Sequence, residues 1–293
     1  MLERYQSTSY ESPEKVIKRM KSFTVNGKIM RYQDVGTGEV LLFGHSYLWN
    51  SQMWQPQVAA LSQNYRCIVP DLWSHGQSDA APDGVHSLKD YAEHMLALMD
   101  HLAIESFSVI GLSVGGMWGS ELALLAPERV KALVLMDTFI GLEPEVMHAK
   151  YFAMLDAAIA TQSFPESIIP QVVPMFFSDH TLQQRPEPEF VTAFRTFLMT
   201  TSGPQVVDIA RIGKIVFDRR DLLDDIHHLE LPVLIMVGEQ DKPRPVLESY
   251  LMQDAIAGSQ LIVIPQAGHI SNLEQPEFVT QALQGFFDTL VDE

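Results

Sequence analysis

One serine in the chain has neighbours that could turn it into a nucleophile. The segment Gly111-Leu112-Ser113-Val114-Gly115 places glycines two residues before and two residues after Ser113. An apolar, strand-like run at 107–110 precedes it and a helical pattern follows, so we expect a tight strand-to-helix turn. Such a turn exposes the serine at the carboxyl edge of a sheet, and the helix start offers free N–H groups to an oxyanion. A nucleotide-binding turn is the alternative, but neither its dinucleotide nor its phosphate-loop spacing is present.

Serine is a weak nucleophile at neutral pH, so this hypothesis requires a histidine base and a carboxylate that orients it. Asp241 follows the apolar run 233–237, and His269 follows the run 261–264. Because parallel strands end at one edge of their sheet, we expect both residues to lie near Ser113. The chain has ten histidines, but no His-x-x-x-His or Cys-His spacing recurs, so we predict no metal site and no cofactor.

The elements that must position these residues can be predicted from hydrophobic patterning. Asn26-Gly27 lies between two β-prone runs and predicts a hairpin. Short apolar runs then alternate with helical patterns, as in a parallel sheet covered by helices on both faces. We expect strands at 40–43, 67–69, 107–110, 133–136, 233–237 and 261–264.

Helical spacing follows Ser87, a predicted N-cap with Asp90 three residues on, and it recurs after Pro276. Between residues 138 and about 220 no strand-like run closes a crossover. This region carries scattered prolines and helix-like pieces at 146–159 and 189–199. We therefore predict one α/β domain with a mostly helical insertion.

The composition excludes several classes of partner. With 20 Lys and Arg against 37 Asp and Glu, the formal charge is -17, which repels nucleic acid and anionic lipid headgroups. The single cysteine, Cys67, cannot form an internal disulfide and fits a reducing compartment. Residues 1–21 contain no apolar signal region, and no stretch approaches the ~20 apolar residues of a membrane span. We expect a soluble, cytoplasmic protein.

These motifs resemble those of the α/β-hydrolase superfamily over nearly all of the chain, with Ser113, Asp241 and His269 at the nucleophile, acid and base positions. The segment 65–72, the residues His75-Gly76-Gln77-Ser78 after it, and Gly268-His269 ahead of an acidic, proline-containing helix start are similar to the family's signatures. A serine nucleophile excludes the branches that use aspartate, such as epoxide hydrolases and haloalkane dehalogenases. The resemblance implies an α/β-hydrolase core domain formed by residues 1–137 and 226–293, with a helical cap at 138–225.

The chain departs from the family pattern at the expected oxyanion hole. The family usually has His-Gly-x after its first parallel strand, whereas this chain has His45-Ser46-Tyr47 when aligned on Trp54. The resemblance therefore implies that the N–H groups of Tyr47 and Val114 bind the oxyanion. Ser74 likewise stands where a glycine is common. Asp137, at the end of the run 133–136, is the alternative acid because some members of the superfamily place it there.

Nine of the fifteen phenylalanines lie in or beside the predicted insertion. Some must form its own core, and the others could line an apolar substrate pocket. We expect this pocket to contain Trp49, Trp118, Phe176, Phe177 and Phe194.

We predict a serine hydrolase that cleaves small to medium apolar carboxylic esters through an acyl-enzyme. Gly-Leu-Ser-x-Gly-Gly also resembles enol-lactonases and acyl-homoserine lactonases of the superfamily, so a lactone substrate is the nearest alternative. A carbon–carbon bond hydrolase or a perhydrolase can use the same triad. A ligand-binding member of the fold with little turnover is an alternative of another class.

Overall fold

The computed structural model describes residues 20–291; residues 1–19 and 292–293, which include most of the segment inspected for a signal sequence, lie outside the described residues. The predicted hairpin is confirmed. Strands β1 (Lys21–Val25) and β2 (Lys28–Val35) pair antiparallel. Asn26 and Gly27 join them with φ values of 48° and 77°, which Asn and Gly tolerate better than other residues do.

Eight strands form a single sheet in the order β1-β2-β4-β3-β5-β6-β7-β8. The remaining strands are β3 (Glu39–Gly44), β4 (Tyr65–Pro70), β5 (Phe107–Leu112), β6 (Val130–Met136), β7 (Val233–Gly238) and β8 (Gln260–Ile264). From β4 to β8 all neighbouring strands are parallel, while β2 pairs antiparallel with β4. The predicted α/β-hydrolase fold, with a mostly parallel sheet, is therefore confirmed.

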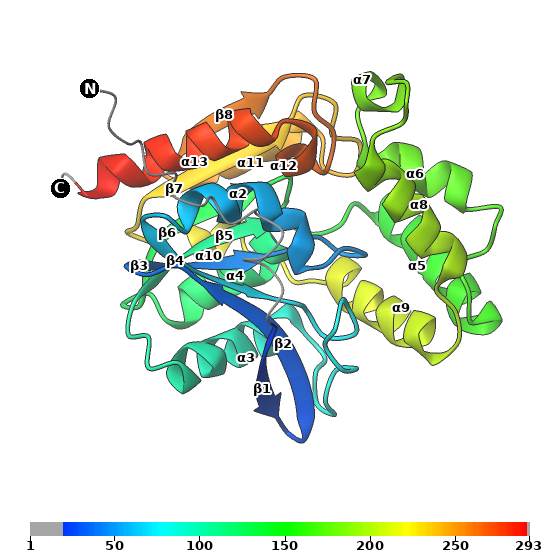
Figure 1. Cartoon of the computed structure of the whole chain (residues 1–293), viewed down its shortest axis with the longest axis horizontal. Helices are drawn as coiled ribbons and strands as arrows, with labels where there is room; N and C mark the ends of the chain where they lie inside the picture. The colour runs from blue at the N-terminus through cyan, green and yellow to red at the C-terminus, as the bar shows by residue number, and fades with distance from the viewer. Residues whose placement is uncertain (1–19, 292–293) are drawn as a thin grey trace, which may run out of the picture.

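Helices cover both faces of the sheet (Figure 1). On one face α2 (Gln55–Leu61) packs against α13 (Pro276–Val291). On the other, α3 (Leu88–His101) packs against α4 (Val114–Leu125). Two apolar clusters result, because alternate side chains of each strand point to opposite faces. Helix α3 begins at the predicted N-cap, where Ser87 and Asp90 form a capping box.

The last strand differs from its prediction. The run at 261–264 was expected to be covered on both faces, but β8 is the edge of the sheet and 37% of Val263 is exposed. Helix α11 (Val246–Ala255) packs against β7 and β8. The short elements η1 (Ser51–Trp54) and α12 (Ser271–Glu274) contact each other and α2. No helix within residues 20–291 is long and apolar enough to cross a membrane.

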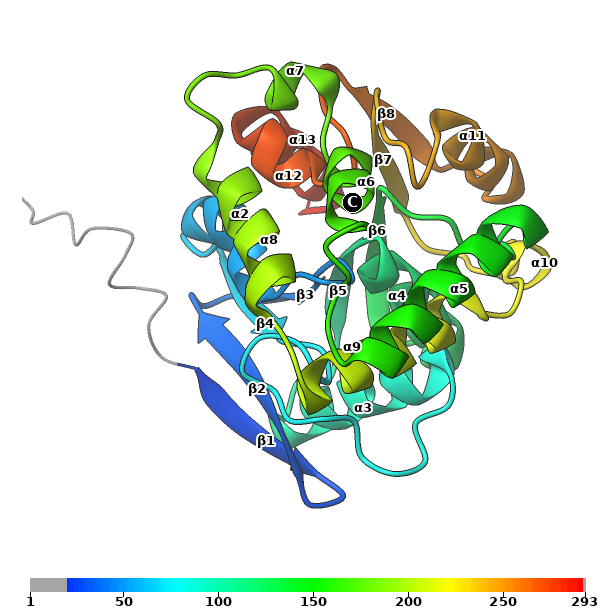
Figure 2. The same ribbon diagram turned by 90° about the vertical axis from the view of Figure 1, so that its right-hand side faces the viewer.

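Between β6 and β7 the chain is helical. It forms α5 (Glu145–Thr161), α6 (Ile169–Phe176), α7 (Asp179–Leu182), α8 (Glu189–Thr200), α9 (Pro204–Phe217) and α10 (Leu223–Ile226). Helix α5 packs against α9, and α6 packs against α8. Figure 2 looks onto these four helices, which lie in front of the sheet. Helix α10 instead contacts α4 and α11, so the last part of the segment 138–225 packs with the sheet domain.

Candidate active site

Ser113 lies in the turn between β5 and α4, with φ 57° and ψ −119°. A positive φ is unfavourable for a residue other than glycine, so neighbouring contacts must hold this turn. The Ser113 N–H donates to the Met136 carbonyl at 2.8 Å, and the Thr138 hydroxyl donates to the Ser113 carbonyl at 2.7 Å. The end of β6 thus fixes the backbone of Ser113 on both sides.

The glycines around Ser113 are required by close packing of backbone. A Cβ at Gly111 would lie 2.2 Å from the carbonyl carbon of Gly115, and a Cβ at Gly115 would lie 2.1 Å from the Gly44 oxygen. Both distances are far below any real contact. The Gly-x-Ser-x-Gly spacing therefore lets the start of α4 lie directly against the end of β3.

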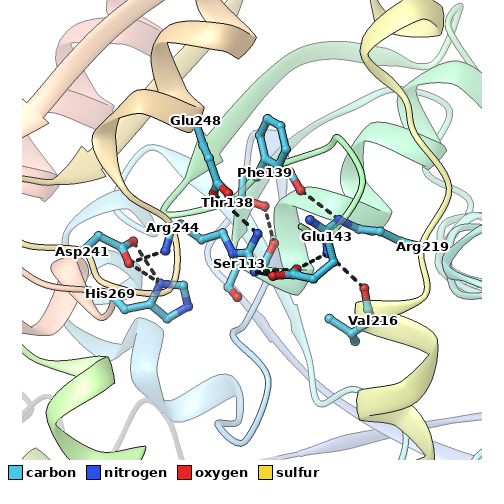
Figure 3. A network of polar contacts seen from close by, with 10 residues as sticks. All are labelled: Ser113, Thr138, Phe139, Glu143, Val216, Arg219, Asp241, Arg244, Glu248 and His269. Atoms are coloured by element: carbon cyan, nitrogen blue, oxygen red, sulfur yellow. Dashed lines mark hydrogen bonds and ion pairs between the residues drawn. The ribbon is translucent and has the colours of Figure 1, made fainter. Parts of the chain in front are cut away.

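Asp241 and His269 come together as the sequence predicted. Asp241 follows β7 and His269 follows β8, and the imidazole Nδ1 lies 2.9 Å from Asp241 Oδ2 and 3.1 Å from Oδ1. Both residues are buried. Figure 3 shows the His269 ring between the carboxyl group of Asp241 and the side chain of Ser113.

The protonation of this pair is governed by burial. Burial lowers the pKa of His269 to about 4, so the imidazole is neutral near pH 7 and could accept a proton. Burial raises the pKa of Asp241, but the Arg244 N–H, which donates to Oδ1 at 2.9 Å, and the Arg244 charge act in the opposite direction.

Asp137, the alternative acid, makes different contacts. It is fully buried, accepts the Gly238 N–H at 2.7 Å and hydrogen-bonds the Ser271 hydroxyl. Burial and the nearby Asp241 carboxyl raise the pKa of Asp137 well above its usual range. It therefore ties together the loops that carry Asp241 and His269, while the carboxylate that accepts the hydrogen bond of the imidazole is that of Asp241.

Two buried histidines hold the loop after β3, which carries Tyr47. His45 Nε2 accepts the Leu72 N–H at 2.9 Å, and His75 Nε2 accepts the Leu48 N–H at 3.1 Å. Burial lowers the pKa of His45 to about 4 and that of His75 to about 3, so both rings are neutral near pH 7 and hold the loop by accepting main-chain hydrogen bonds.

Within the described residues the N–H of Tyr47 donates to no protein acceptor. Val114 opens α4, where helical amides lack partners inside the helix. These two amides are thus free to bind an anion. Ser74, which replaces a common glycine, has φ 66°, so it adopts the glycine-like backbone without being glycine.

An apolar cavity of about 90 Å³ adjoins these residues. Its walls come mainly from α5 and α6, and they include Tyr47, Tyr151, Met154, Leu155, Ala158, Phe164, Val172 and Phe176. The ring of Phe176 also meets the His269 imidazole edge-on, with centroids 5.4 Å apart. Ser113 and His269 do not line the cavity; Phe176 lies in its wall and contacts the His269 ring.

A second hollow of about 600 Å³ lies between the start of η1 and α8, and Trp49 and Phe194 line it. Their rings stack with centroids 5.1 Å apart. Trp118 and Phe177, also expected in the pocket, are fully buried and line neither of these two hollows. Trp118 packs under Gly44, and Phe177 packs against Trp49 and Phe194.

Sequence reasoning missed a cluster of buried charges beside Asp241, formed by Glu143, Arg219, Arg244 and Glu248. Charged residues are usually exposed, so nothing in their spacing indicated burial. The only available signal was Arg244 itself, three residues after the predicted acid and between two prolines.

Comparisons of the sequence and of the structure with known proteins agree on one family. A family model described as alpha/beta hydrolase fold matches residues 39–276. The chain is 26% identical to 3-oxoadipate enol-lactonase 2 of Acinetobacter baylyi, covering 90% of this chain and 94% of that protein. It is 28% identical to a carboxylesterase of Bacillus subtilis, covering 84% and 79%. A solved thermophilic esterase from Thermogutta terrifontis has a TM-score of 0.82 at 27% identity, covering 92% and 98%.

Proposed function

This chain belongs to the α/β-hydrolase family, and from that premise we propose that it hydrolyses carboxylic esters of small apolar acids with Ser113 as nucleophile. The observation that carries the proposal is the buried His269–Asp241 pair, 2.9 Å apart, whose ring faces Ser113 (Figure 3). A serine at a strained turn, a neutral imidazole and a carboxyl group on its far nitrogen are the parts that acyl transfer needs.

In the proposed reaction Ser113 Oγ attacks the ester carbonyl while His269 Nε2 takes the hydroxyl proton. The N–H groups of Tyr47 and Val114 stabilise the oxyanion of the tetrahedral intermediate. His269 then returns the proton to the leaving alcohol, which leaves an acyl group on Ser113. Water, deprotonated by His269, attacks that acyl group and restores the enzyme, while Asp241 holds the productive tautomer throughout.

The size of the apolar cavity supports a short acyl group. Its volume is about 90 Å³, whereas an apolar cavity of about 150 Å³ holds benzene. A chain of a few carbons therefore fits, and longer chains require the cavity to enlarge. Met154 and Phe176 in its wall provide adaptable contacts.

Lactone hydrolysis is the second candidate, supported by the similarity to an enol-lactonase at 26% identity. The same chemistry opens a lactone, because a lactone is a cyclic ester. Its leaving alcohol stays attached to the acyl group. A panel of nitrophenyl acetate, butyrate and hexanoate together with γ- and δ-lactones separates the two by kcat/KM.

The decisive experiment is active-site labelling with a fluorophosphonate, followed by mass spectrometry of the peptides. The adduct is expected on Ser113 and absent in Ser113→Ala. Ser120→Ala is the matched control, because Ser120 is also buried on α4 but donates to the Gly116 carbonyl. An adduct on another residue would refute the proposal. The absence of a nitrophenol burst from nitrophenyl butyrate with wild type would also refute it and favour a ligand-binding role.

A further inference from the structure

Three of the four buried charged residues beside Asp241 are joined by ion pairs, with Glu143 between Arg219 and Arg244 (Figure 3). Arg244 Nη2 lies 2.7 and 2.6 Å from the two carboxylate oxygens of Glu143. Arg219 Nη1 lies 2.9 Å from Glu143 Oε2, and its Nε donates to the Phe139 carbonyl at 3.1 Å. The three side chains are only 2–3% exposed, so water screens these ion pairs very little.

The cluster joins three separate parts of the chain. Glu143 lies between β6 and α5, where the chain enters the inserted helices, and Arg219 follows α9, where the chain leaves them. Arg244 belongs to the loop after β7 that carries Asp241, and its main-chain N–H donates to Asp241 Oδ1 at 2.9 Å. One carboxylate thus ties both connections of the insertion to the acid loop.

We propose that Arg244 is a positioning residue for Asp241, and that Glu143 makes this position depend on the placement of the inserted helices. The inference rests on the proposed function, since it assigns Asp241 the role of orienting His269. The Arg244 side chain does not contact the imidazole by hydrogen bond; it acts by fixing the backbone that binds Asp241 and by its charge.

A buried, charge-assisted contact explains how the position is fixed. The Nη2 nitrogen of Arg244 contacts both oxygens of Glu143, which anchors the end of the Arg244 side chain. Pro243 and Pro245 flank Arg244 and restrict the loop backbone further. An anchored Arg244 side chain therefore holds its own N–H against Asp241 Oδ1.

The charge of Arg244 acts on the same pair. It lowers the pKa of Asp241 and that of His269. Glu274, at the end of α12, raises both pKa values, and Asp137, at the end of β6, raises that of His269. Glu248 lies 3.5 Å from Arg244 on the other side, and Tyr151 also faces it. Removing the cation makes both Asp241 and His269 easier to protonate. Both effects raise the pH at which kcat/KM falls on acidification, which we call the acid limb of the activity profile.

The structure provides a matched pair of variants for the test. Arg244→Met and Arg219→Met each remove one buried cation from the same Glu143 carboxylate, but only Arg244 belongs to the acid loop. For Arg244→Met we expect kcat/KM to fall on the order of 10²-fold, as a displaced catalytic group does. We also expect the acid limb to rise by on the order of one pH unit. Arg219→Met should lose thermal stability but keep the wild-type acid limb.

A second readout does not need turnover. The proton NMR signal of the His269 Nδ1–H, assigned by its loss in His269→Gln, reports the hydrogen bond to Asp241. It should shift or broaden in Arg244→Met and stay in place in Arg219→Met. If Arg244→Met fails to fold, Arg244→Lys against Arg219→Lys repeats the comparison, because lysine keeps the charge but lacks the planar, pre-organised guanidinium.

The inference would be overturned if Arg244→Met and Arg219→Met changed the acid limb and the NMR signal equally. The cluster would then have only a structural role. Failure of the proposed function looks different, because wild type would then lack the fluorophosphonate adduct on Ser113. The NMR comparison still decides the positioning role in that case.

Discussion

The hydroxyl of Tyr47 donates a hydrogen bond of 2.9 Å to the main-chain carbonyl of Ile209 in α9. One helical turn further on, a Cβ at Gly213 would lie only 2.5 Å from that hydroxyl oxygen. The Tyr47 ring is buried and also packs edge-on against Phe217. An inserted helix therefore rests directly on the residue whose N–H we assign to the oxyanion hole.

Gly213→Ala should lower kcat, because the added methyl group pushes the Tyr47 ring and with it the loop that holds the Tyr47 N–H. We expect a loss of about 10- to 100-fold, with little change in KM, since the oxyanion exists only in the transition state. Steady-state kinetics on nitrophenyl butyrate measure both constants. In a helix without this contact, alanine would instead add about 1 kcal/mol of stability.

The control for this variant is the double substitution Gly213→Ala/Tyr47→Leu, in which the clash is removed. The alanine should cost far less kcat in the Tyr47→Leu background than in wild type. Equal losses in the two backgrounds would show that Gly213 acts elsewhere.

Asp241→Asn should reduce kcat on the order of 10⁴-fold, because an amide cannot hold His269 in the tautomer that accepts the Ser113 proton. Asp137→Asn should retain most activity, since the hydrogen bonds of Asp137 go to Gly238 and Ser271 and an amide can still make them. Asp137→Ala should lower the melting temperature by losing the bonds to Gly238 and Ser271. The reverse ranking of the two Asn variants would move the acid to Asp137.

The sheet and the placement of Ser113, Asp241 and His269 at its edge were predictable because they depend on local patterns. Each lies directly after a short apolar run, and parallel strands end at one edge. The Asn26-Gly27 turn and the Ser87 cap are equally local signals. Such features require no knowledge of which distant segments meet.

Distant contacts explain what the sequence did not indicate. Glu143 and Arg244 are 101 residues apart and meet only because the insertion returns to the sheet edge. Trp118 was expected at the pocket because it lies near Ser113 in sequence, but its side of α4 faces Gly44 and the core. Helix patterns alone do not show which neighbour covers a given face.

The activity of the protein should extend to unusually low pH for a histidine base. An ordinary histidine has a pKa near 6.5, but burial lowers that of His269 to about 4. The base is active when neutral, so kcat/KM should fall with acidification well below pH 6.5, as the pH approaches 4. A limb centred near pH 6.5 would contradict the buried, neutral imidazole.

Folding must be followed in the same experiment by circular dichroism. His45, His75 and His269 have lowered pKa values, so at these three side chains the unfolded state binds more protons than the folded state below about pH 6.5. Their contribution to stability is therefore lost as the pH falls from about 6.5 towards 4. Recovery of full activity after return to pH 7 separates titration of His269 from unfolding.

Phe176 and Phe177 offer a direct test of which aromatic residues select the acyl chain. They are adjacent and both buried, but only Phe176 lines the 90 Å³ cavity and touches the His269 ring. Either Phe→Ala change should cost about 3–5 kcal/mol of stability, because each leaves a void in the core. Only Phe176→Ala should raise the ratio of kcat/KM for hexanoate over acetate esters, by up to ~10-fold, as the cavity lengthens. If Phe177→Ala shifts this ratio as much as Phe176→Ala does, and the two variants have similar melting temperatures, chain-length selection lies outside this cavity.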